Sequence, residues 1–149
     1  MATEPKRMPF GLKKPTLETQ YQIDYDWWER SGKDLNIFLR SILCDMHRER
    51  FEDLDADMMV DHVDPDTAEV RQVPGIMHTL ITHCSQQDDY ITPQTSLVNA
   101  IFRLFIANGN APLSINEISE ELNRPASMIL RMLSGSRVIH GIRPVSSEG

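Results

Sequence analysis

The spacing of apolar residues along the chain predicts a mostly helical first half. Residues 34–44 carry apolar side chains three and four positions apart, which places them on one face of a helix. Asp34 precedes this face, where a carboxylate favours a helix N-terminus. Further helices are expected over residues 48–54 and 76–84.

One stretch between these helices has the pattern of a β-hairpin. Residues 58–63 alternate between apolar and polar, Asp64-Pro65-Asp66 supplies turn chemistry, and residues 70–73 return. An acidic cluster precedes the hairpin, and its spacing lacks the glycine and the terminal glutamate of a calcium loop. We therefore interpret this cluster as a solvated face; its members are Glu52, Asp53, Asp55 and Asp57.

The sequence from Thr92 onward predicts a second helical unit. Thr92 is a capping residue followed by proline, so we expect a helix to begin there. Asn108-Gly109-Asn110 should end this helix. Its apolar face is formed by Leu97, Ile101, Leu104 and Phe105.

Residues 113–133 predict two short helices joined by a tight turn. Ser114 can cap the first helix and form a capping box with Glu117, three residues further on. Asn123 suits the turn because asparagine tolerates a positive φ at modest cost. Pro125 suits the first turn of the second helix, which we expect to extend to residue 134.

This pair resembles a helix-turn-helix. Ser119 is at the position where the two helices cross closely, Asn123 is at the turn position, and Ile129 is at the apolar position of the second helix. Gly135 can end that helix in the left-handed conformation, and residues 137–145 then alternate like a strand. Three helices followed by a short β-element resemble the winged-helix group. Only one strand can be identified in this part of the sequence, so the wing is either abbreviated or completed by the N-terminal lobe.

Charge and composition divide the chain into three parts. The first twenty residues are proline-rich and have a net charge of +2, which predicts a flexible basic arm. Residues 21–94 hold six basic and sixteen acidic side chains, and the remainder has a net charge of +1. The expected fold is mainly α with a small β component. It comprises an arm over 1–20, an acidic N-terminal helical lobe with a hairpin over 21–91, and a winged-helix-like lobe over 92–149.

Composition also narrows the class of function. No apolar run is long enough for a membrane span, and residues 1–15 lack the apolar core of a secretory signal. The two cysteines suit a reducing environment. Neither a glycine-rich phosphate loop nor a nucleophile elbow is present. We therefore expect a cytoplasmic protein that is not an enzyme.

Two cysteine–histidine pairs form a candidate zinc site. Cys44 and His47 have a spacing with which both can bind one zinc ion, and His83 with Cys84 would complete a tetrahedral set. Adjacent side chains diverge by about 100° on a regular helix, which makes His78 an alternative to His83. The competing interpretation is a small buried cysteine with surface histidines.

Double-stranded DNA is the first candidate partner, bound by the second helix of the pair. Arg131 can reach a guanine edge or a phosphate, and Ser127 a phosphate. Three more arginines flank them, namely Arg124, Arg137 and Arg143. If these arginines pair with carboxylates, the lobe is instead a protein-docking module. A homodimer would double the number of phosphate contacts.

The alternative function is a non-catalytic adaptor, or accessory subunit, of a protein assembly. Residues 21–28 hold two tyrosines and both tryptophans, and such side chains dominate both cores and interfaces. Burial in the core is the favoured interpretation, whereas exposed Trp27 or Trp28 would mark a partner surface together with Tyr25. The sequence thus leaves open a DNA-binding transcription regulator and a protein-interaction adaptor.

Overall fold

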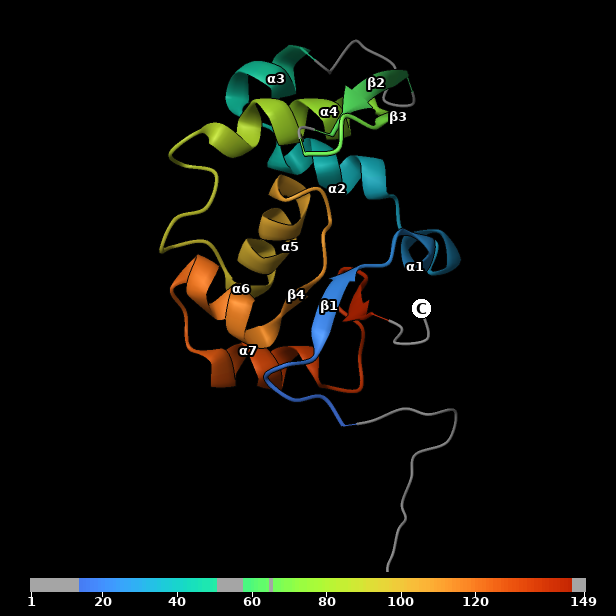
Figure 1. Ribbon diagram of the computed structural model, residues 1–149. Helices are drawn as coiled ribbons and strands as arrows, with labels where there is room; N and C mark the ends of the chain where they lie inside the picture. The colour runs from blue at the N-terminus through green and yellow to red at the C-terminus, as the bar shows by residue number, and fades with distance from the viewer. Residues whose placement is uncertain (1–13, 51–57, 65, 146–149) are drawn as a thin grey trace, which may run out of the picture.

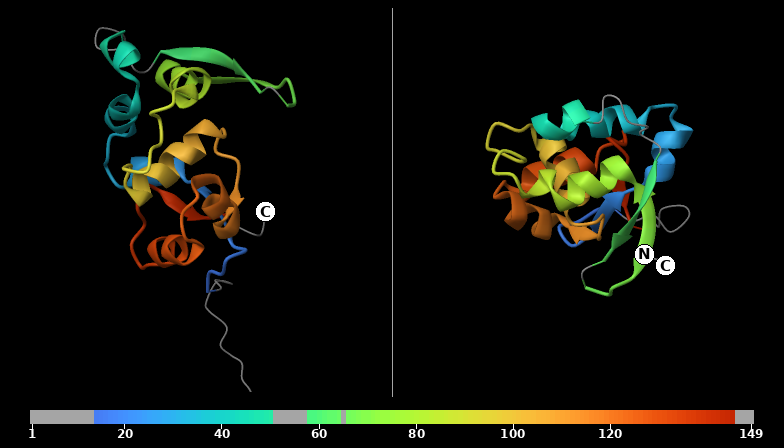
Figure 2. Two further views of the ribbon diagram at one scale, coloured as in Figure 1. Left: turned by 90° about the vertical axis from the view of Figure 1, so that its left-hand side faces the viewer. Right: turned by 90° about the horizontal axis from the view of Figure 1, so that it is seen from above.

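The computed structural model describes residues 14–50, 58–64 and 66–145, and it is mainly α-helical with a small β component, as predicted (Figure 1). Helices α2–α4 lie with the hairpin β2–β3 in an upper group, and α5–α7 lie with the other strands below (Figures 1 and 2). In chain order the elements are β1 (Gln20–Ile23), α1 (Tyr25–Arg30), α2 (Leu35–Ile42), α3 (Asp45–Arg50), β2 (Met59–Val63), β3 (Val70–Pro74), α4 (Gly75–Thr82), the 3-10 helix η2 (Cys84–Gln86), α5 (Leu97–Ala107), β4 (Leu113–Ser114), α6 (Ile115–Leu122), α7 (Ala126–Leu133) and β5 (Ile142–Pro144).

A three-stranded antiparallel sheet joins the two ends of the described chain. Its strand order is β4-β1-β5, so that Tyr21 pairs with Leu113 on one side and with Pro144 on the other. Asn110 secures the same strand, because its Oδ1 accepts from the Ile23 N–H at 2.8 Å and its Nδ2 donates to the Ile23 carbonyl at 2.9 Å. A strand from the N-terminal part is therefore the centre of a sheet whose outer strands are C-terminal.

The strand predicted over residues 137–145 is shorter than its alternation indicated. β5 is three residues long, and Ile139 reaches it through a single bridge. His140 and Gly141 have φ angles of 52° and 77°, so the backbone turns between them. A Cβ atom on Gly141 would lie 2.9 Å from Nε1 of Trp28, which adds a steric reason for glycine. The C-terminal β-element is thus shorter than predicted, and β1 from the N-terminal part pairs with it. The resemblance to the winged-helix group stays a prediction.

The pair α6–α7 forms as the sequence predicted. Ser114 Oγ accepts from the Glu117 N–H at 3.1 Å, and Glu117 Oε1 accepts from the Ser114 N–H at 2.8 Å, which completes the capping box. Asn123 ends α6 with a φ of 57°, in the left-handed region. Ile118 and Ile129 are fully buried.

The helices α5 and α7 have boundaries that differ from the predicted ones. The helix expected from Thr92 begins at Leu97 with Ser96 as its N-cap, because Thr92 Oγ1 accepts from the Gln94 N–H and holds residues 92–95 in a turn. At the other end of the lobe, α7 starts one residue after Pro125 and ends at Leu133. Gly135 has no positive φ and does not cap it.

Helices α2–α4 and the hairpin lie close to their predicted positions, whereas α1 was not predicted. α2 has Asp34 as its N-cap, and the hairpin pairs all five residues of β2 with β3. α3 begins at residue 45, earlier than the predicted 48, and the acidic cluster over residues 52–57 lies outside the described residues. α4 ends at Thr82, two residues before the expected end, and η2 follows.

One hydrophobic core runs through both groups of elements. The Trp28 ring lies 5.4 Å from that of Phe38 and 5.9 Å from that of Phe102, and Trp28 Nε1 donates to the His140 carbonyl. Residues 21–23 were assigned to the acidic lobe, yet they pair with strands of the C-terminal region. The division of the chain into an arm (1–20) and two lobes (21–91 and 92–149) stays a prediction. β1, however, belongs to the same sheet as the C-terminal strands.

Candidate metal centre

Two of the four candidate ligands lie at the turn between α2 and α3. Leu43 leaves the helical conformation with a ψ of 147°, so the chain changes direction before Cys44, and His47 follows in the first turn of α3. Arg48 holds this turn, because its Nη2 donates to the Leu43 carbonyl at 2.8 Å and its Nη1 pairs with Asp45 at 2.9 Å. The helix break is what directs Cys44 and His47 toward one point.

The other two ligands lie where α4 gives way to η2. On an unbroken helix His83 and Cys84 would diverge. His83 instead has a φ of −128° and a ψ of −61°, which is outside the helical region, so the chain turns between the two elements. This break brings the adjacent side chains to the same point. His78, the alternative ligand, has its Nδ1 3.2 Å from Nδ1 of His62 and is engaged elsewhere.

The four ligand atoms lie within 4.8 Å of one another. Cys44 Sγ is 3.5 Å from Cys84 Sγ, 3.3 Å from His47 Nδ1 and 3.7 Å from His83 Nδ1. Zinc bonds of about 2.3 Å to sulfur and 2.0 Å to nitrogen give a tetrahedron with edges of about 3.3 to 3.8 Å. The three distances from Cys44 Sγ lie within this range, and the whole cluster, which spans up to 4.8 Å, would contract slightly around a tetrahedral ion.

Ionisation of the Cys84 thiol requires a positive charge nearby. Burial, together with the neighbouring Cys44 thiol, raises the pKa of Cys84 to about 11, so without a positive charge the thiol keeps its proton. A bound divalent metal reverses this preference and stabilises the thiolate. The Cys44 backbone N–H lies 3.4 Å from Cys84 Sγ and donates to it. A closed set of four protein ligands is typical of a structural metal, because a catalytic zinc keeps one position open.

The residues predicted to contact DNA fall into two groups. Ser127, Arg131 and Arg137 are exposed, and no hydrogen bond or ion pair of theirs is found within the described ranges. Arg124 is half-buried, and its Nη2 donates to carbonyls of the turn before α5, at 2.8 Å for Thr95 and 3.2 Å for Thr92. Arg143 pairs with the Asp24 carboxylate at 3.1 Å. Two of the five side chains are thus already engaged with the protein.

The predicted aromatic contact residues are largely part of the core. Trp28 is 4% exposed, and Tyr25 and Trp27 are half-buried. Burial raises the pKa of Tyr25 to about 12. Trp28 is therefore a core residue and is not accessible to a partner, which agrees with the favoured interpretation of this segment.

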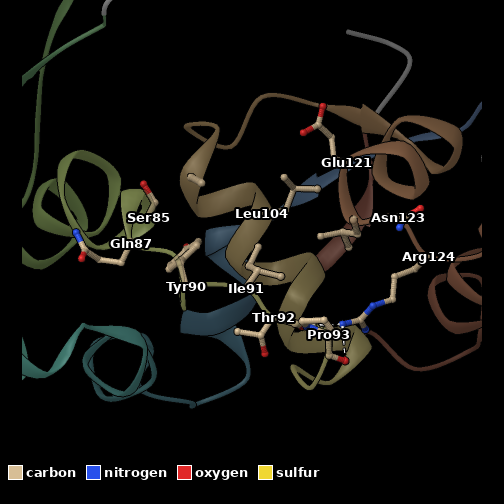
Figure 3. Close-up of a pocket in the computed structure, with 12 residues that line it drawn as sticks. Ser85, Gln87, Tyr90, Ile91, Thr92, Pro93, Leu104, Glu121, Asn123 and Arg124 are labelled. Carbon is tan, nitrogen blue, oxygen red and sulfur yellow. Dashed lines mark hydrogen bonds between the residues drawn. The ribbon is translucent and has the colours of Figure 1, made fainter.

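Two further features were not singled out from the sequence. One is the His62–His78 pair described above. Its signal was the period-two alternation of β2, which turns His62 inward. The other is an open groove of about 540 Å³ between the segment before α5, α5 itself and the turn after α6 (Figure 3). Figure 3 shows Arg124 extending from that turn toward Pro93, with Ile91 and Leu104 on the floor of the groove.

Comparisons of the chain with protein-family models, with curated proteins and with solved structures returned no match. Within the described residues, each helix is too short or too polar to cross a lipid bilayer.

Proposed function

We propose that the protein binds one structural zinc ion through Cys44, His47, His83 and Cys84. The observation that carries the proposal is the convergence of four soft or borderline ligands, from two segments 40 residues apart, to within 4.8 Å of one another. Thiolate and imidazole ligands in this combination select zinc over hard cations such as Mg²⁺ or Ca²⁺.

In this role the ion ties the turn between α2 and α3 to the end of α4. Both turns depart from helical geometry at the ligands, and such breaks need compensation from tertiary contacts. A metal that binds only the folded state adds its binding free energy to folding. The upper group of helices therefore depends on the ion for its arrangement.

Metal content of protein purified without chelator tests the proposal. We expect about one zinc per chain, and we expect Co²⁺ substitution to give the absorption bands of tetrahedral thiolate coordination. His83→Ala should lower the content, whereas His78→Ala, a matched histidine on α4 outside the cluster, should leave it unchanged. Protein with no bound metal, or equal losses in both variants, would refute the assignment.

A second candidate function is DNA binding by the exposed face of α7. Ser127 and Arg131 on α7 and Arg137 after it support this function, because they are exposed and have no partner in the part of the chain that the structure describes. The adaptor alternative is supported by the engagement of Arg124 and Arg143 with protein oxygens.

Titration with mixed-sequence and selected duplexes at two salt concentrations separates these two functions. If α7 contacts DNA, Arg131→Ala should weaken binding. A lost phosphate contact should also make the slope of log binding constant against log salt concentration shallower by about one. Arg71→Ala, which removes an exposed arginine of the hairpin, is the matched control and should have no effect. Absence of binding by the wild-type protein under all conditions would leave the adaptor as the surviving function.

A further inference from the structure

The two cysteine sulfurs of the cluster are close enough to each other to react. Cys44 and Cys84 are the only cysteines of the chain, and their Sγ atoms lie 3.5 Å apart. A disulfide needs about 2.05 Å. Both residues lie at breaks between helices, outside regular secondary structure or at its first residue, where a small backbone adjustment can close the gap.

A small polar cavity of about 110 Å³ is lined in part by both cysteines. Besides Cys44 and Cys84, its lining includes Arg48, Arg103 and Tyr90. A water-sized molecule occupies about 30 Å³ of liquid volume, so the cavity has room for a peroxide. Arg103 Nη1 donates to the Tyr90 carbonyl at 2.7 Å, which holds this side chain at the cavity.

We propose that the Cys44–Cys84 pair makes the zinc site a peroxide-sensitive switch, in which oxidation to a disulfide releases the ion. This inference rests on the proposed zinc binding and adds a mode of regulation to the same site. Hydrogen peroxide is the oxidant. The remaining two imidazoles are too few ligands to retain zinc against competing chelators.

The reaction proceeds in two balanced steps. The Cys44 thiolate attacks one peroxide oxygen, which breaks the O–O bond, forms a sulfenic acid and releases hydroxide, which takes up a proton to become water. The Cys84 thiolate then attacks the Cys44 sulfur and displaces a second hydroxide, which is likewise protonated. In total, two thiolates, one peroxide and two protons give one disulfide and two waters, and the two electrons pass from sulfur to oxygen.

The structure assigns different roles to the two sulfurs. Cys44 is half-buried, whereas Cys84 is 1% exposed and accepts a hydrogen bond from the Cys44 N–H. The more exposed sulfur is the one that an oxidant from solvent reaches first. Cys44 is therefore the residue that reacts first, and Cys84 is the residue that resolves the sulfenic acid.

The test begins with zinc-loaded wild-type protein, whose metal content is measured before any oxidant is added. A failure of zinc binding is thereby recorded separately from a failure of the switch. Peroxide is then added, with zinc release followed by a chromogenic chelator and free thiols by a colorimetric titration. We expect zinc and both thiols to disappear with the same rate constant, and both to return after dithiothreitol and zinc are supplied. Zinc that stays bound at peroxide levels that oxidise free cysteine would overturn the proposal.

Variants test the order of the two sulfurs. Cys84→Ser should accumulate a sulfenic acid on Cys44 that dimedone traps, whereas Cys44→Ser should leave Cys84 oxidised at least ten times more slowly. Equal rates in the two variants would overturn the assignment of roles. Met46→Leu is the control for methionine oxidation, because Met46 is exposed two residues from Cys44. Its zinc release should match that of the wild type, and slower release would attribute the response to methionine.

Discussion

Replacement of Asn110 would show how much the link between β1 and the segment after α5 contributes to stability. The side chain makes two hydrogen bonds to the backbone of Ile23, and Asn110 itself has a φ of 64°. Asn110→Gly removes both bonds without a penalty for positive φ, and a net value of about 1 kcal/mol per bond gives a loss of about 2 kcal/mol. Asn110→Ala adds about 1 kcal/mol more, because alanine is strained in the left-handed region.

Urea unfolding, followed by the fluorescence of the buried Trp28, measures these differences. The expected order of stability is wild type, then Asn110→Gly, then Asn110→Ala. The difference in unfolding free energy between the two variants measures the cost of a positive φ at this position. The difference between the wild type and the glycine variant measures the contribution of the two hydrogen bonds. A glycine variant as stable as the wild type would refute the reasoning that these two bonds hold β1 in place.

Three further predictions concern separate parts of the molecule. Ile118→Ala or Ile129→Ala should lower the free energy of unfolding in urea by about 2–4 kcal/mol, because both side chains are fully buried. Met128→Ala, which changes an exposed neighbour on α7, should cost much less. A loss below about 0.5 kcal/mol for either isoleucine would contradict its packing. Ser114→Ala should cost about 1 kcal/mol through loss of the N-cap, measured against Ser127→Ala as a solvent-exposed serine control on α7. Burial, with a smaller effect of Lys33, lowers the pKa of His140. As the pH drops, the unfolded chain therefore takes up a proton on this histidine before the folded protein does. The free energy of unfolding should fall as the pH drops below about 6.5 toward the lowered pKa. His140→Asn, which keeps a residue tolerant of its positive φ, should flatten this part of the pH profile, and an unchanged profile would assign the effect to another group.

The features that the sequence predicted well are those set by neighbours within a few residues. The capping box of Ser114 and Glu117 and the left-handed turn at Asn123 depend on local hydrogen bonds and on φ preferences. The β-hairpin follows from alternation around a turn. Thr92-Pro93 misled because the turn over residues 92–95 uses the same residue types that begin helices.

Features that depend on distant parts of the chain were not accessible in the same way. Nothing in residues 20–23 indicates that they pair with strands beginning at residues 113 and 142. The ligand types of the metal centre were readable from chemistry, but the argument against adjacent His83 and Cys84 assumed an unbroken helix. The backbone break at His83 removes that objection, and it is a consequence of tertiary packing, which propensity does not report.

The central position of β1 also has a consequence for the order of folding. Asn110 and Ile23 are 87 positions apart, and Asp24 and Arg143 are 119 apart, so the sheet can close only after nearly the whole described chain is available. The two halves of the metal cluster are 40 positions apart, and α2 contacts α4 directly. Loop closure over shorter distances costs less entropy, and contacts between distant residues slow folding. We therefore expect the cysteine–histidine cluster to assemble early and the β4-β1-β5 sheet to form last. Until then β1 has no paired strand.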